Sequence, residues 1–174
     1  MASARDVAGL DKTQLAALMS SGRAVRVDEL AGFGFRGTSL GLPAWMDRLL
    51  WKTFAKVFVP HQGELHGFNL RIDQRSTVPL EPRANRPRFG EFEVRSERET
   101  VLDYGLKNPR WSPLHPLRDT LVVVQEEPLV LLGRSYFELA GRLIPTPSYF
   151  TLERTLSLPV GSELATAHHR IEAV

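Results

Sequence analysis

The chain of 174 residues contains no cysteine, which excludes disulfide bonds, thiol catalysis and thiolate metal sites. It also has no large excess of one charge, because the formal net charge is only +2. A nucleic-acid partner held by surface charge is therefore not expected. No stretch reaches the roughly 20 apolar residues that cross a bilayer, so we expect no integral membrane segment. Asp6, Asp11 and Lys12 interrupt the apolar residues of positions 1–22, unlike a signal peptide, and we expect a cytoplasmic protein.

What the chain does contain is typical of a folded domain. Its residues are 43% hydrophobic and 24% charged, and a chain of this size buries about 70% of its unfolded surface. No repeat or low-complexity segment divides it. We predict a single domain over residues 1–160, followed by a loosely ordered tail from Gly161 to Val174.

The spacing of apolar residues predicts two helices. The first covers residues 10–19, with Asp11 or Thr13 as its N-cap. The second runs from Ala44 to Val59, where apolar side chains recur at i, i+3, i+4 and i+7, and Pro60 ends the pattern. We expect the first helix to pack on a sheet and the second to frame the mouth of a pocket.

The rest of the chain has the two-residue period of β-strands. Residues 24–40 are expected to be extended, and Phe68, Leu70 and Ile72 alternate with polar side chains after Glu64. Further strands are predicted at Phe89–Arg95, Thr100–Tyr104, Leu121–Gln125, Leu129–Phe137 and Tyr149–Leu156. About seven strands in hairpins indicate a mainly β fold: an antiparallel barrel with one or two packing helices.

An aromatic residue on the first strand and an arginine on the last are placed to close one end of such a barrel. Phe33 and Phe35 share one face of their strand. Arg154 has the parity of Phe150 and Leu152, so its guanidinium can lie over an aromatic ring on the apolar side. We predict that Phe35 and Arg154 form a structural closure; an anion contact by Arg154 is the alternative.

The segment from Gly32 to Gly37 also matches the G-x-G-x-x-G pattern of dinucleotide-binding proteins. That pattern requires a helix directly after it and an acidic residue about 20 positions later, and both are missing. We therefore expect no nucleotide cofactor.

Arg134 is the strongest candidate for a ligand contact. It shares the parity of Val130 and Leu132, and an arginine on an apolar face needs an anionic partner. That partner is either a core acid, Asp103 or Asp119, or an acidic ligand. The other predicted ligand-binding residues are Tyr136, Asn69, Arg71, Trp51 and Phe54.

Asp103 and Tyr104, at a predicted strand end, allow two interpretations. The carboxylate can fix the loop ends by accepting hydrogen bonds. Alternatively, Asp103 is a general base and Tyr104 a proton donor, the tentative catalytic pair of this chain.

The five histidines show no spacing of a known metal site, and we expect no metal and no cofactor. The alternative is haem bound in a barrel, with His66 as its axial ligand.

Several short motifs follow one another along the chain. They are Phe35-Arg36-Gly37, Gly67-Phe68-Asn69, Leu102-Asp103-Tyr104-Gly105, Leu117-Arg118-Asp119, Leu132-Gly133-Arg134-Ser135-Tyr136 and Tyr149-Phe150-Thr151-Leu152-Glu153-Arg154. This set, over roughly residues 25–156, resembles uncharacterised bacterial proteins related to those named for a Gly-x-Trp-x-Gly motif. In this chain Phe33 stands for the first glycine and Phe35 for the tryptophan. The resemblance implies a lipocalin-like, or calycin-like, fold with no established activity and no catalytic residues.

Three functions remain as hypotheses. The first is binding of a small hydrophobic or amphipathic molecule in a barrel pocket. The second is an enzyme that acts on such a molecule through Asp103 and Tyr104. The third is a protein interaction or assembly module, including a homo-oligomer, that uses Trp45, Trp51 and Trp111.

Overall fold

A computed structural model of the chain describes residues 4–40, 52–72, 88–96 and 98–157. Within these ranges the chain forms short helices and a sheet of nine strands. The elements are α1 (Ala4–Ala8), α2 (Lys12–Ser21), β1 (Arg23–Ala24), α3 (Val27–Leu30), β2 (Phe33–Leu40), β3 (Thr53–His61), β4 (Glu64–Arg71), β5 (Arg88–Ser96), β6 (Thr100–Asp103), β7 (Leu117–Gln125), β8 (Val130–Leu139) and β9 (Arg142–Ser157).

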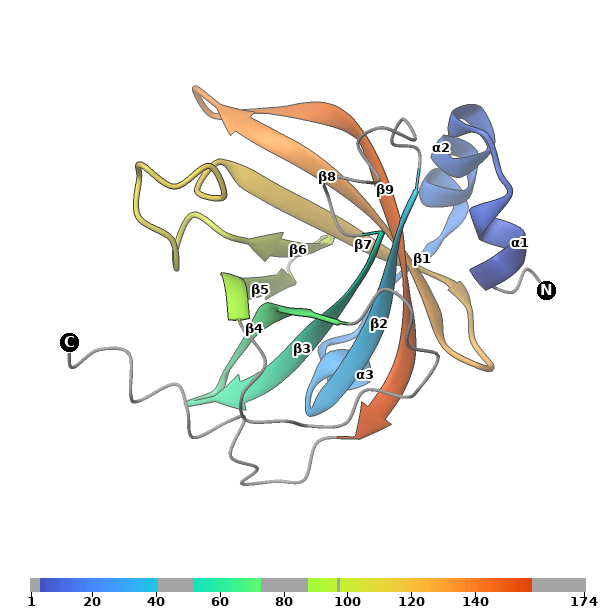
Figure 1. Cartoon of the computed structure of the whole chain (residues 1–174), viewed down its shortest axis with the longest axis horizontal. Helices are drawn as coiled ribbons and strands as arrows, with labels where there is room; N and C mark the ends of the chain where they lie inside the picture. The colour runs from blue at the N-terminus through green and yellow to red at the C-terminus, as the bar shows by residue number, and fades with distance from the viewer. Residues whose placement is uncertain (1–3, 41–51, 73–87, 97, 158–174) are drawn as a thin grey trace.

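The sheet closes on itself as an eight-stranded antiparallel barrel, which confirms the predicted fold class (Figure 1). Each strand from β2 to β9 pairs with the next along the chain, and β9 pairs back with β2, with Phe35 opposite Arg154. Strand β1 adds a short pairing outside the ring, with Arg23 opposite Val123 of β7. This order of consecutive hairpins is an up-and-down barrel, in which no strand edge of the ring is left open.

Helices α1 and α2 pack outside the barrel wall, α1 against β9 and α2 against β7 and β8 (Figure 1). Helix α2 matches the first predicted helix: Asp11 accepts a hydrogen bond from the backbone N–H of Gln14 at 2.9 Å, and the Gln14 side chain accepts one from Asp11 N–H. Leu15 packs there against Leu132 and Tyr149 on the outer face of the wall. No described helix is long and apolar enough to span a membrane.

The prediction of a helix from Ala44 to Val59 is wrong over its described part, because residues 53–61 form β3. Residues 41–51 lie outside the described ranges. The segment favours a strand because it is rich in β-branched and aromatic side chains, Thr53, Phe54 and Val57 among them. Apolar residues fill both faces of this strand, so the two-residue alternation is hidden and a helical stripe can be drawn through it.

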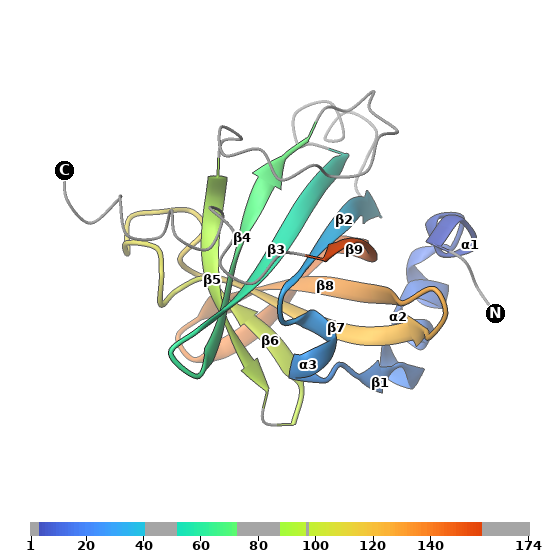
Figure 2. The same ribbon diagram turned by 90° about the horizontal axis from the view of Figure 1, so that it is seen from below.

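Residues 24–40 are also not extended throughout. The short helix α3 interrupts them and lies beside β1 and the start of β2 (Figure 2). Its Leu30 is fully buried in the main core with Phe35 and Phe58. We call this end of the barrel, where β2 begins, the α3 end. The opposite end, where β2, β4, β6 and β8 end, is the cavity end.

Candidate functional site

A cavity of about 230 Å³ occupies the interior of the barrel at the cavity end. Its walls come from nearly every strand of the ring and from the β6–β7 loop. The lining residues are Ser39, Phe54, Lys56, Asn69, Phe89, Tyr104, Leu114, Leu117, Asp119, Ser135, Ser148 and Phe150. The cavity therefore has aromatic and aliphatic walls with a few polar groups, the composition that small-molecule sites share.

Two glycines make room for the aromatic walls. A side chain at Gly37 would overlap the ring of Phe54, and one at Gly133 would overlap the ring of Phe150. The two rings meet edge to face with centroids 5.8 Å apart. Glycine at these two positions therefore leaves room for the rings that line the cavity.

A buried cation lies at the inner limit of this cavity. The side chain of Lys56, on the inward face of β3, is 3% exposed. Its Nζ donates hydrogen bonds to Asn69 Oδ1 at 2.9 Å, to Asp119 Oδ2 at 3.1 Å and to the hydroxyl of Tyr104. Three acceptors satisfy the three N–H groups of the ammonium, as burial of a charge requires.

The acid of this cluster is held from three directions. Asp119 Oδ2 accepts from Lys56 and also from the Tyr104 hydroxyl, at 3.0 Å, while Oδ1 accepts from Ser135 Oγ at 2.7 Å. Asn69 is fixed by its own amide, which donates to the carbonyl of Gly90 at 3.1 Å. The polar groups therefore have one arrangement set by neighbouring strands.

Aromatic rings enclose the Lys56 ammonium. The Nζ atom lies 5.0 to 5.5 Å from four ring centroids. These rings belong to Phe54, Phe92, Tyr104 and Phe150. Ring faces stabilise a cation at this distance, and they also exclude the water that would otherwise solvate it.

This enclosure changes the proton affinity of two groups. Burial lowers the pKa of Lys56, and the carboxylate of Asp119 opposes the shift only in part. Burial, followed by the charge of Asp119, raises the pKa of Tyr104 well above its ordinary value. The cluster therefore pairs an amine that gives up its proton more readily with a phenol that keeps its own, 3 Å from a carboxylate.

Two of the predicted ligand-binding residues do line this cavity. Asn69 contacts Lys56, and Phe54 forms part of the wall. Arg71 is the last residue of β4. Trp51 lies outside the described residues.

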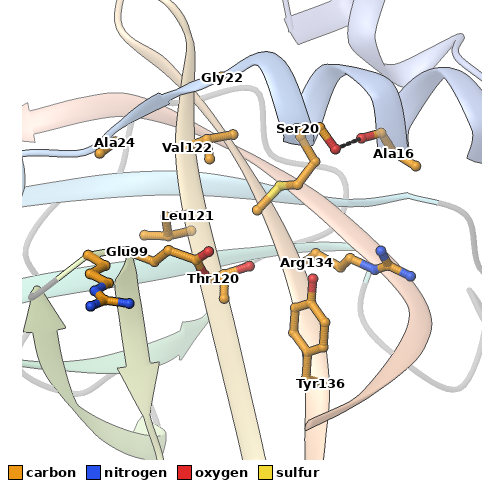
Figure 3. Close-up of a pocket in the computed structure, with 12 residues that line it drawn as sticks. Ala16, Ser20, Gly22, Ala24, Glu99, Thr120, Leu121, Val122, Arg134 and Tyr136 are labelled. Atoms are coloured by element: carbon orange, nitrogen blue, oxygen red, sulfur yellow. Dashed lines mark hydrogen bonds between the residues drawn. The ribbon is translucent and has the colours of Figure 1, made fainter.

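The placement of Arg134 inside the barrel is wrong. Ser135 and Gly133 face inward, so Arg134 and Tyr136 face outward and line a second pocket of about 350 Å³ between α2 and the wall (Figure 3). The guanidinium lies over the rings of Tyr136 and Tyr149, at 5.3 and 5.0 Å, and pairs with neither Asp103 nor Asp119. The outer face of β8 is apolar because α2 covers it, so the apolar side and the interior are not the same here.

Asp103 and Tyr104 point in opposite directions. The carboxylate of Asp103 faces outward to Arg118, at 3.2 Å, and accepts the backbone N–H of Gly105 at 2.8 Å. This is the loop-fixing interpretation. Adjacent residues of an extended chain alternate between the two faces, so Tyr104, which follows Asp103, points into the barrel. Its hydroxyl donates a hydrogen bond there to Asp119 and not to Asp103.

The predicted closing pair lies at the α3 end. Arg154 stacks closely on Phe33, 3.9 Å from the ring centroid, and more distantly on Phe35, at 6.0 Å. Its guanidinium also donates to the carbonyl of Glu29 in α3 at 2.8 Å. Phe35 is fully buried and meets the Phe58 ring edge to face. The arginine and the aromatic rings thus connect β9 to β2 and to α3.

Three potential metal ligands converge on the outer wall, where no metal site was expected from the sequence. Ligand atoms of Glu64, His66 and Glu93 all lie within 4.8 Å of one another. His66 faces away from the cavity, because its neighbours Leu65 and Gly67 face inward. The haem alternative placed His66 inside, whereas its ring meets Glu64 outside, with Nε2 3.0 Å from the carboxylate.

Of the tryptophans considered for an interface, Trp111 is 86% exposed on the β6–β7 loop. Trp45 and Trp51 lie outside the described residues. Other exposed apolar side chains gather on the paired ends of β8 and β9: Phe137, Leu139, Leu143 and Ile144.

Sequence reasoning missed the central residue, Lys56, because it lies in the segment from Ala44 to Val59 that was predicted to be a helix. A lysine inside the run from Thr53 to Val59, where every other residue is apolar or threonine, is the signal that could have found it. Asp119 was considered only as a partner for Arg134. No family model matches the chain, and no curated protein matches it either.

Proposed function

We propose that this protein binds a small amphipathic molecule inside the barrel, with the apolar part among the aromatic walls and a polar group at Lys56. The observation that carries the proposal is a charged, hydrogen-bonded cluster placed at the inner limit of an aromatic cavity. A protein that needed only a stable core would fill this space with apolar side chains, which are as stabilising as a buried ion pair, or more so.

The volume limits the size of the ligand. A cavity of roughly 150 Å³ holds one benzene molecule, whereas sites for drug-sized ligands span about 300 to 1,000 Å³. At about 230 Å³ the cavity fits a single substituted ring or a short branched chain. The polar group of such a ligand would be a hydroxyl, carbonyl or carboxylate that replaces one of the three present acceptors of the Lys56 ammonium, Asn69, Tyr104 or Asp119.

We also propose that the protein is related to lipocalin-like proteins and that it is located in the cytoplasm. Such a relation implies that the ligand binds at the open end of the barrel. The stacking of Arg154 on Phe33 at the opposite end supports the relation. The likeness rests on architecture and motifs and is independent of ligand identity.

The test is a binding titration with benzyl alcohol and benzoate as probes, followed by calorimetry and by amide shifts in NMR spectra. Leu114→Trp fills the cavity, and Leu106→Trp makes the same change on the same loop at an exposed residue that does not line the cavity. We expect saturable one-to-one binding that Leu114→Trp abolishes and Leu106→Trp retains. Absence of saturable binding for both probes, or equal loss in both variants, would overturn the proposal.

A further inference from the structure

We propose that Lys56 is a nucleophile that forms an imine with a small aldehyde held in the cavity. This inference rests on the proposed function and specifies the chemical class of its ligand. Lys56 lines the cavity directly, so a carbonyl carbon can reach its Nζ atom without passing through the barrel wall.

Imine formation needs an amine that can lose its proton. The lowered pKa of Lys56 favours the neutral amine, and the acceptor for its proton is already in contact, since Asp119 Oδ2 lies 3.1 Å from Nζ. Lys107, by contrast, is exposed on the β6–β7 loop and lacks such an enclosure. Reactivity is therefore expected at one lysine of the chain in preference to the others.

Lys56 and Asp119 together supply and take up every proton that the reaction needs. The ammonium of Lys56 first transfers a proton to the Asp119 carboxylate. The nitrogen lone pair then forms a bond to the carbonyl carbon, and the carbonyl oxygen takes a proton from nitrogen to give a carbinolamine. Asp119 returns its proton to that hydroxyl, the C–O bond breaks, and water leaves. The products are a protonated imine, water and an ionised Asp119, with no oxidant or reductant consumed.

The surroundings also suit the product. A protonated imine is a cation with one N–H, which Asp119 can accept, and the four rings around Nζ stabilise a cation whether it is an ammonium or an iminium. Tyr104 keeps its hydrogen bond to Asp119 throughout, because its raised pKa holds the phenol protonated. The cavity size selects single-ring or short branched aldehydes.

The experiment is reductive trapping. The protein is incubated with benzaldehyde and cyanoborohydride near neutral pH, and the modified lysines are identified by peptide mass spectrometry. We expect labelling at Lys56 at least 10-fold faster than at Lys107, and suppression of the Lys56 label by excess benzyl alcohol, which has the same shape but no carbonyl. Labelling of Lys56 no faster than Lys107 would overturn the inference.

Two variants serve as controls. Lys107→Met removes an exposed lysine and should leave the Lys56 label unchanged. Lys56→Met/Asp119→Leu removes the cavity amine together with its acid, so that no charge is left buried alone, and it should lose the fast label. The failures are distinguishable: if benzyl alcohol binds but Lys56 is not labelled, only the imine is excluded. If Lys56 is labelled fast but benzyl alcohol neither binds nor protects, the binding proposal fails while the amine remains reactive.

Discussion

The two ends of the barrel use the same kinds of side chain in opposite ways. At the α3 end, Arg154 stacks on the ring of Phe33, donates a hydrogen bond to the backbone carbonyl of Glu29, and keeps much of its surface in water. At the cavity end the corresponding set is Lys56 with its rings and Asp119, and the charges are buried. A cation on aromatic rings is thus exposed at one end, whereas at the other end it is buried and paired with a carboxylate.

The choice of cation explains the difference. Arginine does not lose its proton in proteins, and its planar guanidinium stacks on a ring, so it suits a permanent closure. Lysine carries a compact charge that loses its proton when burial removes solvation. An arginine at the cavity end could not act as a nucleophile, and a lysine at the α3 end would lose the stacked contact.

The largest expected effect is at the cavity end. Asp119→Ala leaves the Lys56 charge buried without its acid and should lower the free energy of unfolding by about 3 to 5 kcal/mol. Replacing the pair together, in Lys56→Met/Asp119→Leu, should restore part of that loss, because no charge is left buried alone, although the hydroxyls of Tyr104 and Ser135 lose their acceptor. Urea unfolding monitored by circular dichroism measures both. Equal destabilisation in the single and double variants would show that the pair does not act as a unit.

The next effect is at the α3 end. Arg154→Ala removes the stacking on Phe33 and the hydrogen bond to the Glu29 carbonyl, and should lower the free energy of unfolding by about 1 to 2 kcal/mol. Arg142→Ala, at an exposed position of the same strand, should change it by less than about 0.5 kcal/mol. If the two variants unfold at the same urea concentration, the closure contributes nothing to stability.

The alkaline side of the stability profile should report the cavity end. The pKa of Lys56 is lower in the folded chain than in the unfolded one, so the unfolded chain binds more protons. The free energy of unfolding therefore gains a term that rises with pH up to about 10, with a slope below about 1.4 kcal/mol per pH unit. The raised pKa of Tyr104 acts in the opposite direction above about pH 10. Urea unfolding at several values from pH 7 to 10 should give a steeper rise in the native chain than in Lys56→Met/Asp119→Leu; identical slopes would contradict it.

The acid side should report the α3 end, with the smallest effect. The hydrogen bond from Arg23 lowers the pKa of Glu29, so this contribution is present above the unfolded pKa, near 4.5, and is lost as the pH falls through the folded value. The Arg23 side chain is 38% exposed, which screens the pair and limits the effect to below about 1 kcal/mol. Arg23→Gln should flatten the stability profile between about pH 5 and 3, whereas Arg142→Gln should not. Unchanged acid dependence in Arg23→Gln would exclude the pair as its source.

Where the sequence misled, the cause was burial on both sides of the wall. The alternation of Phe68 and Leu70 with Asn69 identifies β4 as a strand but not which face is inward, and here Asn69 faces the cavity while Phe68 is buried outside. The same ambiguity placed Arg134 in the interior. A rule that equates the apolar face with the core holds only where the other face meets water.

The sequence by itself determined the mainly antiparallel β fold class, the cap of α2 and the placement of Arg154 on the aromatic side, because these depend on residue spacing and on neighbours along the chain. The tertiary structure alone decided which charges meet. Lys56, Tyr104 and Asp119 lie on or beside three different strands. Only closure of the ring brings Lys56 Nζ and the Tyr104 hydroxyl within 3.1 Å of the same oxygen, Asp119 Oδ2. Local pattern identifies most of the strands, though not β3, whereas the chemistry of the cavity depends on contacts between residues up to 63 positions apart.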